Sequence, residues 1–280
     1  MIGRLYLGRC VSIPYEKNGL QLYWHWANST VNRGETLMKP RPRPGRCWGH
    51  CFLEWGAPVV LLLAVTFFIQ LLDLDLRVEA CFFSSDRGWI YGDRTPWSFL
   101  YRYGALPTIA TAVAALIVYA LSFRWNRFRA QRRAAWFLVL LSIVGPIVVV
   151  NLVLKEHWGR PRPGEVIQFG GEKSYLQVWE RGVSGEGRSF PCGHCSAAFF
   201  FFGLVFVTRR RSRRWTSVAL VSTLIYGALM GVARMAQGGH FPSDVLWSAA
   251  LMYYLSLGLY CLLGLHREET GRADSADQSS

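Results

Sequence analysis

Acidic residues are scarce in this chain. Its 280 residues include 18 Asp and Glu against 31 Lys and Arg, which gives a formal net charge of +13. A strongly basic chain can bind nucleic acid through the phosphate backbone. Here, however, the positive residues alternate with long apolar runs. We therefore attribute the charge to membrane topology, and we expect no nucleic-acid partner.

A disulfide framework and an early apolar leader are also missing. The seven cysteines are an odd number scattered through runs and loops, which does not fit a disulfide-rich fold. The first apolar run begins near residue 55 and more runs follow, so we expect no cleavable signal peptide. The sequence shows no carboxylate cluster suited to Mg²⁺. Cys47-Trp-Gly-His50-Cys51 offers only three ligands, so we predict an unstructured flank there and no metal site.

Long apolar runs dominate what is present. Hydrophobic residues make up 51% of the chain, and runs of about 20 such residues are typical of membrane helices. We predict an all-α fold with six transmembrane helices, of which the fourth is short for a span. Gly145-Pro146 predicts a kink in the third. The predicted spans are 55–72, 105–123, 134–154, 194–208, 215–232 and 245–265.

Basic residues gather in alternate loops, at 124–133 and 209–214 and also before the first span. By the positive-inside rule these segments are cytoplasmic, as are both termini. The chain would lie in a bacterial-type inner membrane with its other loops facing the periplasm or exterior. Residues 1–37 could be an over-extended start. The predicted parts are a cytoplasmic arm (1–54), a six-span domain (55–265) and a disordered cytoplasmic tail (266–280).

The two longest loops differ in composition, and both are predicted to lie on the outer face. Residues 73–103 are rich in aromatic side chains, which favours a segment lying along the membrane surface. The same segment could instead shape a route of access for a lipid. Residues 164–190 contain six glycines and no apolar period, which predicts a flexible loop placed like a lid over a head group.

Three polar segments border the apolar runs, and the first of them runs from Lys155 to Pro163. Lys155 and Arg162 could clamp a doubly charged phosphate, with Arg binding in bidentate fashion and Lys as a point charge. Long basic side chains also reach from a helix end to the membrane interface. This segment alone leaves both interpretations open.

The second polar segment places Cys192, Gly193 and His194 at the start of the fourth run. Backbone N–H groups at a helix N-terminus bind anions, and glycine permits close approach. His194 is suited to proton transfer near neutral pH. Cys192-Gly-His-Cys195 also has the spacing of a dithiol redox site, but thioredoxin-like enzymes need a soluble βαβ context. A disulfide between Cys192 and Cys195 stays open.

The third polar segment contains Arg234, His240 and Asp244. His240 and Asp244 are four apart and Pro242 suits a first helical turn, so the pair can share one face. A carboxylate that orients an imidazole makes it a better nucleophile. Gly238-Gly239 can fold Arg234 back towards them. A structural His–Asp pair beside an interfacial Arg is the alternative.

Together the three segments resemble the type 2 phosphatidic acid phosphatase superfamily, which also includes the vanadium haloperoxidases. The family pattern is Lys-x6-Arg-Pro, then Pro-Ser-Gly-His, then Ser-Arg-x5-His-x3-Asp. Ala233 replaces the serine of the third motif, and Cys192 replaces that of the second. A thiol donates hydrogen bonds more weakly than a hydroxyl, so phosphate affinity could fall. The pattern is matched in order at Lys155, Arg162, Pro163, Pro191, Gly193, His194, Arg234, His240 and Asp244.

The resemblance implies a six-helix membrane phosphatase that needs no metal or other cofactor. His240 would attack phosphorus, Asp244 would orient its ring, and His194 would protonate the leaving oxygen and then activate water. Because the nucleophile must be deprotonated and the acid protonated, the pH profile should be bell-shaped. No obligate protein partner is evident. The phosphate-binding residues would be Lys155, Arg162, Arg234, Gly193 and Cys192.

The implied substrate is a lipid phosphate or lipid pyrophosphate at the outer face of the membrane. Lipid A, undecaprenyl pyrophosphate, phosphatidylglycerol phosphate and phosphatidic acid all stay open, and the two long loops favour a bulky, lipid A-type head group. A lipid phosphotransferase would use the same phospho-histidine. A vanadium haloperoxidase is normally soluble. A non-catalytic transporter or membrane scaffold is the remaining alternative.

Overall fold

The computed structural model describes residues 52–209 and 211–265, most of which are helical. The predicted disordered tail, the Cys47–Cys51 segment and nearly all of the predicted arm lie outside these residues. The proposed domain boundaries therefore stay predictions. Two short strands, β1 (Phe83–Ser84) and β2 (Gly88–Trp89), form an antiparallel hairpin.

The helices of the described chain follow one another with few long connections. The α-helices are α3 (Ala57–Leu71), α4 (Leu74–Ala80), α5 (Trp97–Tyr103), α6 (Leu106–Arg124), α7 (Arg132–Ser142), α8 (Lys155–Trp158), α9 (Gly193–Phe199), α10 (Phe202–Thr208), α11 (Arg213–Met235) and α12 (Pro242–Leu262). The π-helices are η1 (Phe52–Gly56) and η3 (Ile143–Leu154), and the 3₁₀-helices are η2 (Asn126–Gln131), η4 (Pro163–Glu165) and η5 (Ile167–Phe169).

The predicted all-α class is confirmed, but the count of six spans is not. In the described chain, five helices are long and apolar enough to cross a membrane. The fourth predicted span, 194–208, falls on Gly193–Thr208, which is apolar but shorter. This stretch comprises α9 and α10, which are separated at Phe200–Phe201. The five longer helices are Leu53–Leu71, Trp97–Arg124, Asn126–Glu165, Arg213–Met235 and Pro242–Leu262.

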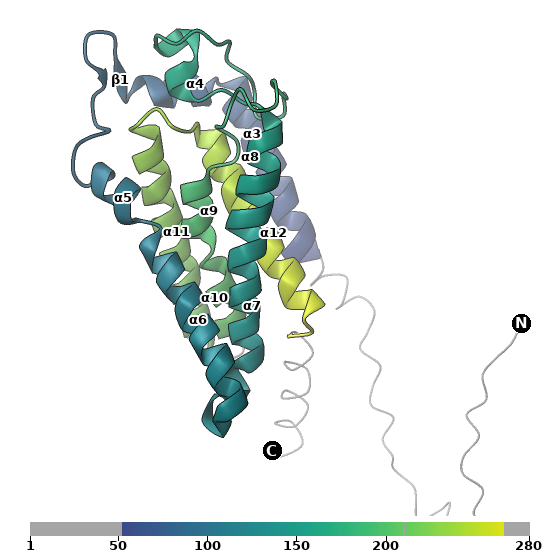
Figure 1. Cartoon of the computed structure of the whole chain (residues 1–280). Helices are drawn as coiled ribbons and strands as arrows, with labels where there is room; N and C mark the ends of the chain where they lie inside the picture. The colour runs from purple at the N-terminus through teal and green to yellow at the C-terminus, as the bar shows by residue number, and fades with distance from the viewer. Residues whose placement is uncertain (1–51, 210, 266–280) are drawn as a thin grey trace, which may run out of the picture. The chain divides into compact units, whose positions relative to one another are not determined.

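The apolar core lies among α7, α9, α10, α11 and α12, where side chains such as Phe137, Phe200 and Met252 are fully buried. Helices α3 and α6 instead expose large apolar side chains, including Phe67 and Ile117. A water-soluble protein seldom leaves such broad apolar surface exposed, whereas a membrane protein presents it to lipid. Figure 1 shows these helices packed side by side as a bundle.

The kink predicted at Gly145-Pro146 coincides with the π-helix η3. Proline has no backbone N–H to donate, so the regular α-helical ladder is interrupted there. The side-chain amide of Asn151 donates to the carbonyl of Pro146 over 2.6 Å. The altered winding also places Asn151 beside the start of α9.

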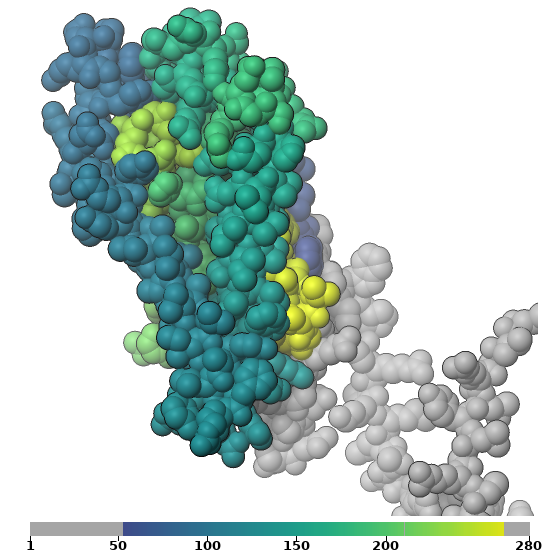
Figure 2. All heavy atoms as spheres, in the orientation of Figure 1, coloured from purple at the N-terminus to yellow at the C-terminus, as the bar shows by residue number. Residues whose placement is uncertain are grey.

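The three polar segments lie at one end of the bundle. Figure 1 shows that α8, the start of α9 and the connection between α11 and α12 share this end. In the space-filling view, the chain that precedes α6 and the loop that follows α8 flank the end of α11 (Figure 2). A small apolar cluster joins these segments. Its buried members are Val166, Phe169 and Phe241.

The glycine-rich loop at 164–190 has more fixed contacts than the sequence indicates. It includes η4 and η5, and a backbone bridge pairs Val166 with Lys173. The indole of Trp158 donates to the carbonyl of Val178 over 3.1 Å. Hydrogen bonds of this kind leave no periodic pattern in the sequence. The glycine content alone therefore predicted a flexible loop. The loop instead follows a defined path over the polar segments.

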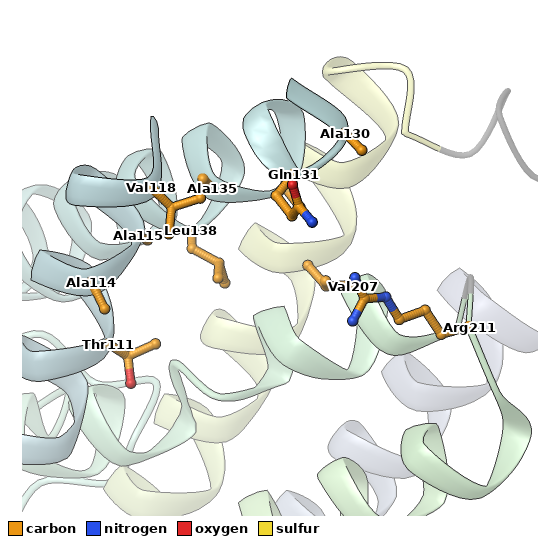
Figure 3. Close-up of a pocket in the computed structure, with 11 residues that line it drawn as sticks. Thr111, Ala114, Ala115, Val118, Ala130, Gln131, Ala135, Leu138, Val207 and Arg211 are labelled. Carbon is orange, nitrogen blue, oxygen red and sulfur yellow. The ribbon is translucent and has the colours of Figure 1, made fainter. Parts of the chain in front are cut away.

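A cavity of about 390 Å³ lies between α6 and α7, towards the opposite end of the bundle (Figure 3). Its lining is mostly small or apolar, for example Ala115 and Leu138, with Gln131 and Arg211 at one side. None of the predicted site residues lines this cavity. The cavity therefore belongs to the membrane-facing bundle and not to the polar end.

Candidate functional site

The structure brings the three predicted segments into one cluster. Lys155, Cys192, Arg234 and His240 all lie within electrostatic range of His194, and Arg162 and Arg234 lie within that range of Lys155. Gly193 begins α9, and Asp244 lies in the first turn of α12. Residues that span about a third of the chain thus share one end of the bundle.

Arg234 is held in place by the turn that follows it. A Cβ atom at Gly239 would lie 2.3 Å from an Arg234 Nη atom, so only glycine allows the side chain to fold back at this point. One Nη donates to the side-chain carbonyl of Gln237. The guanidinium also lies 4.6 Å from the centroid of the Tyr101 ring. The predicted return of Arg234 over Gly238-Gly239 is what the structure shows.

Two buried arginine donors have no partner within the described chain. They are the Nε atoms of Arg162 and Arg234. A buried donor without an acceptor costs about 1–3 kcal/mol, so native proteins rarely leave one unpaired. An anion bound between these arginines would accept from both. The arrangement therefore fits a site that is completed by a phosphate.

His240 and Asp244 are both buried, and their side chains face each other. The distance from His240 Nδ1 to Asp244 Oδ2 is 3.7 Å, which is longer than a hydrogen bond. Catalytic contacts of this kind often shorten only when substrate is bound. Because Nδ1 faces the carboxylate, Nε2 is the nitrogen that remains for attack on a substrate.

Arg160 is a site residue that the sequence interpretation missed. Its guanidinium is fully buried and donates to Asp244 Oδ1 over 2.5 Å, to Asp75 Oδ2 over 2.8 Å and to the carbonyl of Leu176 over 2.9 Å. Buried charges are stable only when they are paired and hydrogen-bonded in this way. Arg160 lies inside the first motif, at one of the six positions for which Lys-x6-Arg specifies no residue. It fixes the carboxylate that faces His240.

Asp75 ties the aromatic loop to the same network. It accepts hydrogen bonds from the backbone N–H of Ser243 over 2.9 Å and from the Ser243 hydroxyl over 2.5 Å. The Tyr175 hydroxyl donates to it over 3.0 Å. The segment predicted to lie along the membrane surface is therefore anchored at the first turn of α12. No sequence signal pairs Asp75 with Arg160, because the two residues are far apart in the chain.

Asp244 has further partners that keep it in place. Its Oδ2 accepts from the Ser189 hydroxyl over 2.5 Å and from the backbone N–H of Phe241 over 2.9 Å. Glu79 is buried near this network. Burial, followed by the charges of Asp244 and Asp75, raises the pKa of Glu79 well above its usual value of 4.5. Burial thus favours the neutral form of Glu79, and the side-chain carboxylates that accept from Arg160 are those of Asp244 and Asp75.

The environment of His240 and Cys192 couples their charges. Burial disfavours a charged His240, but the neighbouring Cys192 and Asp244 outweigh it and raise the pKa of His240 above its usual 6.5. Burial likewise disfavours a thiolate at Cys192. A hydrogen bond from Cys195, with the charges of His240 and Arg234, nevertheless lowers the pKa of Cys192 well below 9.0.

Gly193 and Tyr101 complete the cluster. A Cβ atom at residue 193 would lie 2.9 Å from the side-chain oxygen of Asn151, so the close packing of α9 on η3 needs glycine. The rings of Tyr101 and His194 have centroids 5.1 Å apart. Tyr101 thus contacts both His194 and Arg234, a role that its place in an aromatic loop did not indicate.

In the described chain, no group of His, Cys, Asp and Glu is placed to hold a metal ion.

Comparisons with known proteins point to one family. The PAP2 superfamily profile matches residues 134–267, a range that contains all eight predicted site residues. A lipid A 4'-phosphatase of Francisella tularensis subsp. novicida (strain U112) is 30% identical over 213 residues, which cover 75% of this chain and 95% of that protein. A lipid A 4'-phosphatase of Rhizobium etli is 29% identical over 238 residues, which cover 80% and 91%. No solved structure matches the chain.

Replacing Arg160 by Lys should lower the rate of phosphate release. Lysine cannot bridge Asp75 and Asp244 with a planar fork, and a misplaced catalytic group costs roughly 100-fold in rate. Arg181→Lys, at an exposed arginine, is the matched control and should keep normal activity. Steady-state assays on detergent-purified proteins with equal melting temperatures would measure the effect. Equal rates for Arg160→Lys and wild type would contradict the positioning role.

With an aryl phosphate, whose leaving group needs no proton from His194, the pH profile of kcat/KM should lose activity on its acid side at a midpoint above 6.5. A histidine that acts as a nucleophile must be unprotonated, and the pKa of His240 is raised, so activity that depends on neutral His240 should fall as pH drops through that value. Cys192→Ser removes a thiolate charge that raises the pKa of His240, so the acid midpoint should move to lower pH. Cys81→Ser, at an exposed cysteine, should leave it in place. An acid midpoint unchanged by Cys192→Ser would refute this coupling.

Proposed function

Because this chain belongs to the PAP2 superfamily and is a phosphatase that acts on a lipid, we propose that it removes a phosphate from a lipid A-type glycolipid. The reaction would pass through a phospho-histidine at His240 and need no metal ion. The observation that carries this proposal is the convergence of Lys155, Arg162 and Arg234 around two histidines, one of which faces a buried carboxylate.

In the first step, Nε2 of His240 attacks phosphorus and forms an N–P bond while the P–O bond to the lipid breaks. Asp244 faces Nδ1 and stabilises the positive charge that develops on the ring. Arg160, Ser189 and the backbone at Phe241 hold Asp244 in place. The nucleophile is therefore oriented by a carboxylate whose own position is fixed.

His194 supplies and then removes the proton. It protonates the leaving oxygen of the lipid in the first step. In the second step it takes a proton from water, whose oxygen bonds to phosphorus while the N–P bond to His240 breaks. A doubly charged phosphate bound among Arg234 and Lys155 would stabilise the imidazolium that must act as the acid. Tyr101 packs against the His194 ring and limits its orientation.

The cations stabilise the transition state. Phosphoryl transfer spreads negative charge over three equatorial oxygens, and fixed donors aimed at those oxygens lower the barrier. The unpaired Nε atoms of Arg162 and Arg234 are such donors. Lys155 adds a third positive charge, and the start of α9 at Gly193 adds backbone N–H groups. Cys192 occupies the position of the family's serine; only its thiol form can donate, and it does so more weakly than a hydroxyl.

The substrate class rests on the relatives and on the site's position. Both relatives described above carry the name lipid A 4'-phosphatase. The site lies at one end of an apolar bundle, where the phosphate of a membrane-anchored lipid could reach it. The basic loops border the opposite ends of the helices, so the positive-inside rule puts the site on the periplasmic or exterior face. Both described termini of the bundle would then be cytoplasmic.

The test is phosphate release by purified protein from lipid A, undecaprenyl pyrophosphate, phosphatidylglycerol phosphate and phosphatidic acid, with EDTA present. We expect release from lipid A and a loss of about 1,000-fold or more in His240→Ala, as for removal of a nucleophile. His157→Ala, at an exposed histidine, is the control and should stay active. Loss of activity in EDTA would refute the metal-free mechanism. Full activity of His240→Ala would refute the assigned nucleophile.

A further inference from the structure

Cys192 and Cys195 form a pair of thiols at the start of α9. The proposed mechanism assigns a role to Cys192 alone. Cys192 is the N-cap of the helix, and its Sγ accepts a hydrogen bond from the backbone N–H of Cys195 over 3.2 Å. Both side chains are fully buried, and both thiols are free. Cys195 has no assigned part in phosphate transfer.

The geometry of the pair suits a disulfide. Residues three apart at a helix start have Cα atoms roughly 5 Å apart, within the range of about 4.4–6.8 Å that a disulfide spans. The Sγ of Cys192 already lies over the first turn, next to the backbone of Cys195. Bond formation would therefore need rotation of side chains and no large movement of the backbone.

The two thiols differ in reactivity. A thiolate, and not a thiol, attacks oxidants. The hydrogen bond from Cys195 and the positive charges of His240 and Arg234 favour the thiolate at Cys192. Gly193 and His194 between the cysteines are only partly buried, so a small molecule can approach from the phosphate side. Cys192 is thus the attacking sulfur and Cys195 the resolving one.

We propose that Cys192 and Cys195 are an oxidisable dithiol, a modification site for small hydroperoxides that blocks the phosphate site when its disulfide forms. The Cys192 thiolate attacks the O–O bond of hydrogen peroxide, which gives a sulfenic acid and, after protonation, water. The Cys195 thiol then attacks this sulfur, the S–S bond forms and a second water leaves. Two thiols are oxidised and one peroxide is reduced, and an external dithiol reverses the change.

The expected consequence is loss of phosphatase activity, and this part rests on the proposed function. The disulfide turns the Cys192 sulfur towards Cys195 and removes it from the phosphate pocket. It also changes the N-cap of α9, beside the backbone of Gly193 and His194. Bound inorganic phosphate should slow the oxidation, because it occupies the path by which peroxide reaches Cys192.

The experiment oxidises reduced, full-length protein with hydrogen peroxide, blocks remaining thiols with N-ethylmaleimide under denaturing conditions, and digests it with trypsin. Cleavage after Arg188 and Arg209 yields peptide 189–209, which contains Cys192 and Cys195 and no other cysteine. We expect this peptide without N-ethylmaleimide and two hydrogens lighter than its reduced form. Activity should fall about 100-fold, as when one donor to a developing oxyanion is lost, and dithiothreitol should restore it.

Cys195→Ser is the decisive variant. It should keep basal activity and form no disulfide, so peroxide should drive Cys192 to sulfinic acid, and dithiothreitol should not restore activity. Cys81→Ser should behave like wild type. Exposed Cys81 also serves as an internal gauge of oxidant dose.

Two outcomes separate this proposal from the proposed function. If both thiols of peptide 189–209 take up N-ethylmaleimide at a dose that oxidises Cys81, the dithiol site is refuted, whatever the phosphatase activity. If the disulfide forms but the reduced protein releases no phosphate from any lipid in the panel, the modification site stands and the proposed function fails.

Discussion

The guanidinium of Arg160 lies buried between Asp75 and Asp244, two carboxylates that come from opposite ends of the described chain. Removing Arg160 would leave two carboxylates in the interior without their counter-charge, at a cost of about 3–5 kcal/mol. The network therefore joins the segment before α6, the loop after α8 and the first turn of α12 as one unit. The site is built on that unit.

The same network separates the charges that would otherwise conflict in a phosphate site. A carboxylate near a phosphate dianion would repel it, yet the nucleophilic histidine needs a carboxylate to orient it. Here Asp244 is neutralised from behind by Arg160 and hydrogen-bonded by Ser189. The arginines on the phosphate side are not fully paired with protein groups, since Arg162 and Arg234 each keep an Nε without a hydrogen-bond partner. Attraction for phosphate and orientation of His240 thus coexist.

Much of this arrangement could be predicted from sequence, because apolar runs and motif spacing are local signals. The runs predicted the helices, and Gly145-Pro146 predicted a kink at the place where the chain forms a π-helix. The motifs predicted which charged residues meet. Arg160 and Asp75 could not be found this way, because a pairing between distant segments leaves no period in the chain. The contacts of Tyr101 with Arg234 and His194 could not be predicted either, because the surrounding loop contains many aromatic residues and nothing in the sequence distinguishes this one.

The most direct test of the account is to trap the covalent intermediate. Protein mixed briefly with phosphorylated lipid would be quenched at alkaline pH, which preserves phosphate bound to nitrogen, and its tryptic peptides analysed by mass spectrometry. We predict phosphate on His240 in peptide 235–267 of the wild type and none on that peptide of His240→Ala. Phosphate on peptide 189–209, or no phosphopeptide in either protein while wild type still releases phosphate, would contradict it.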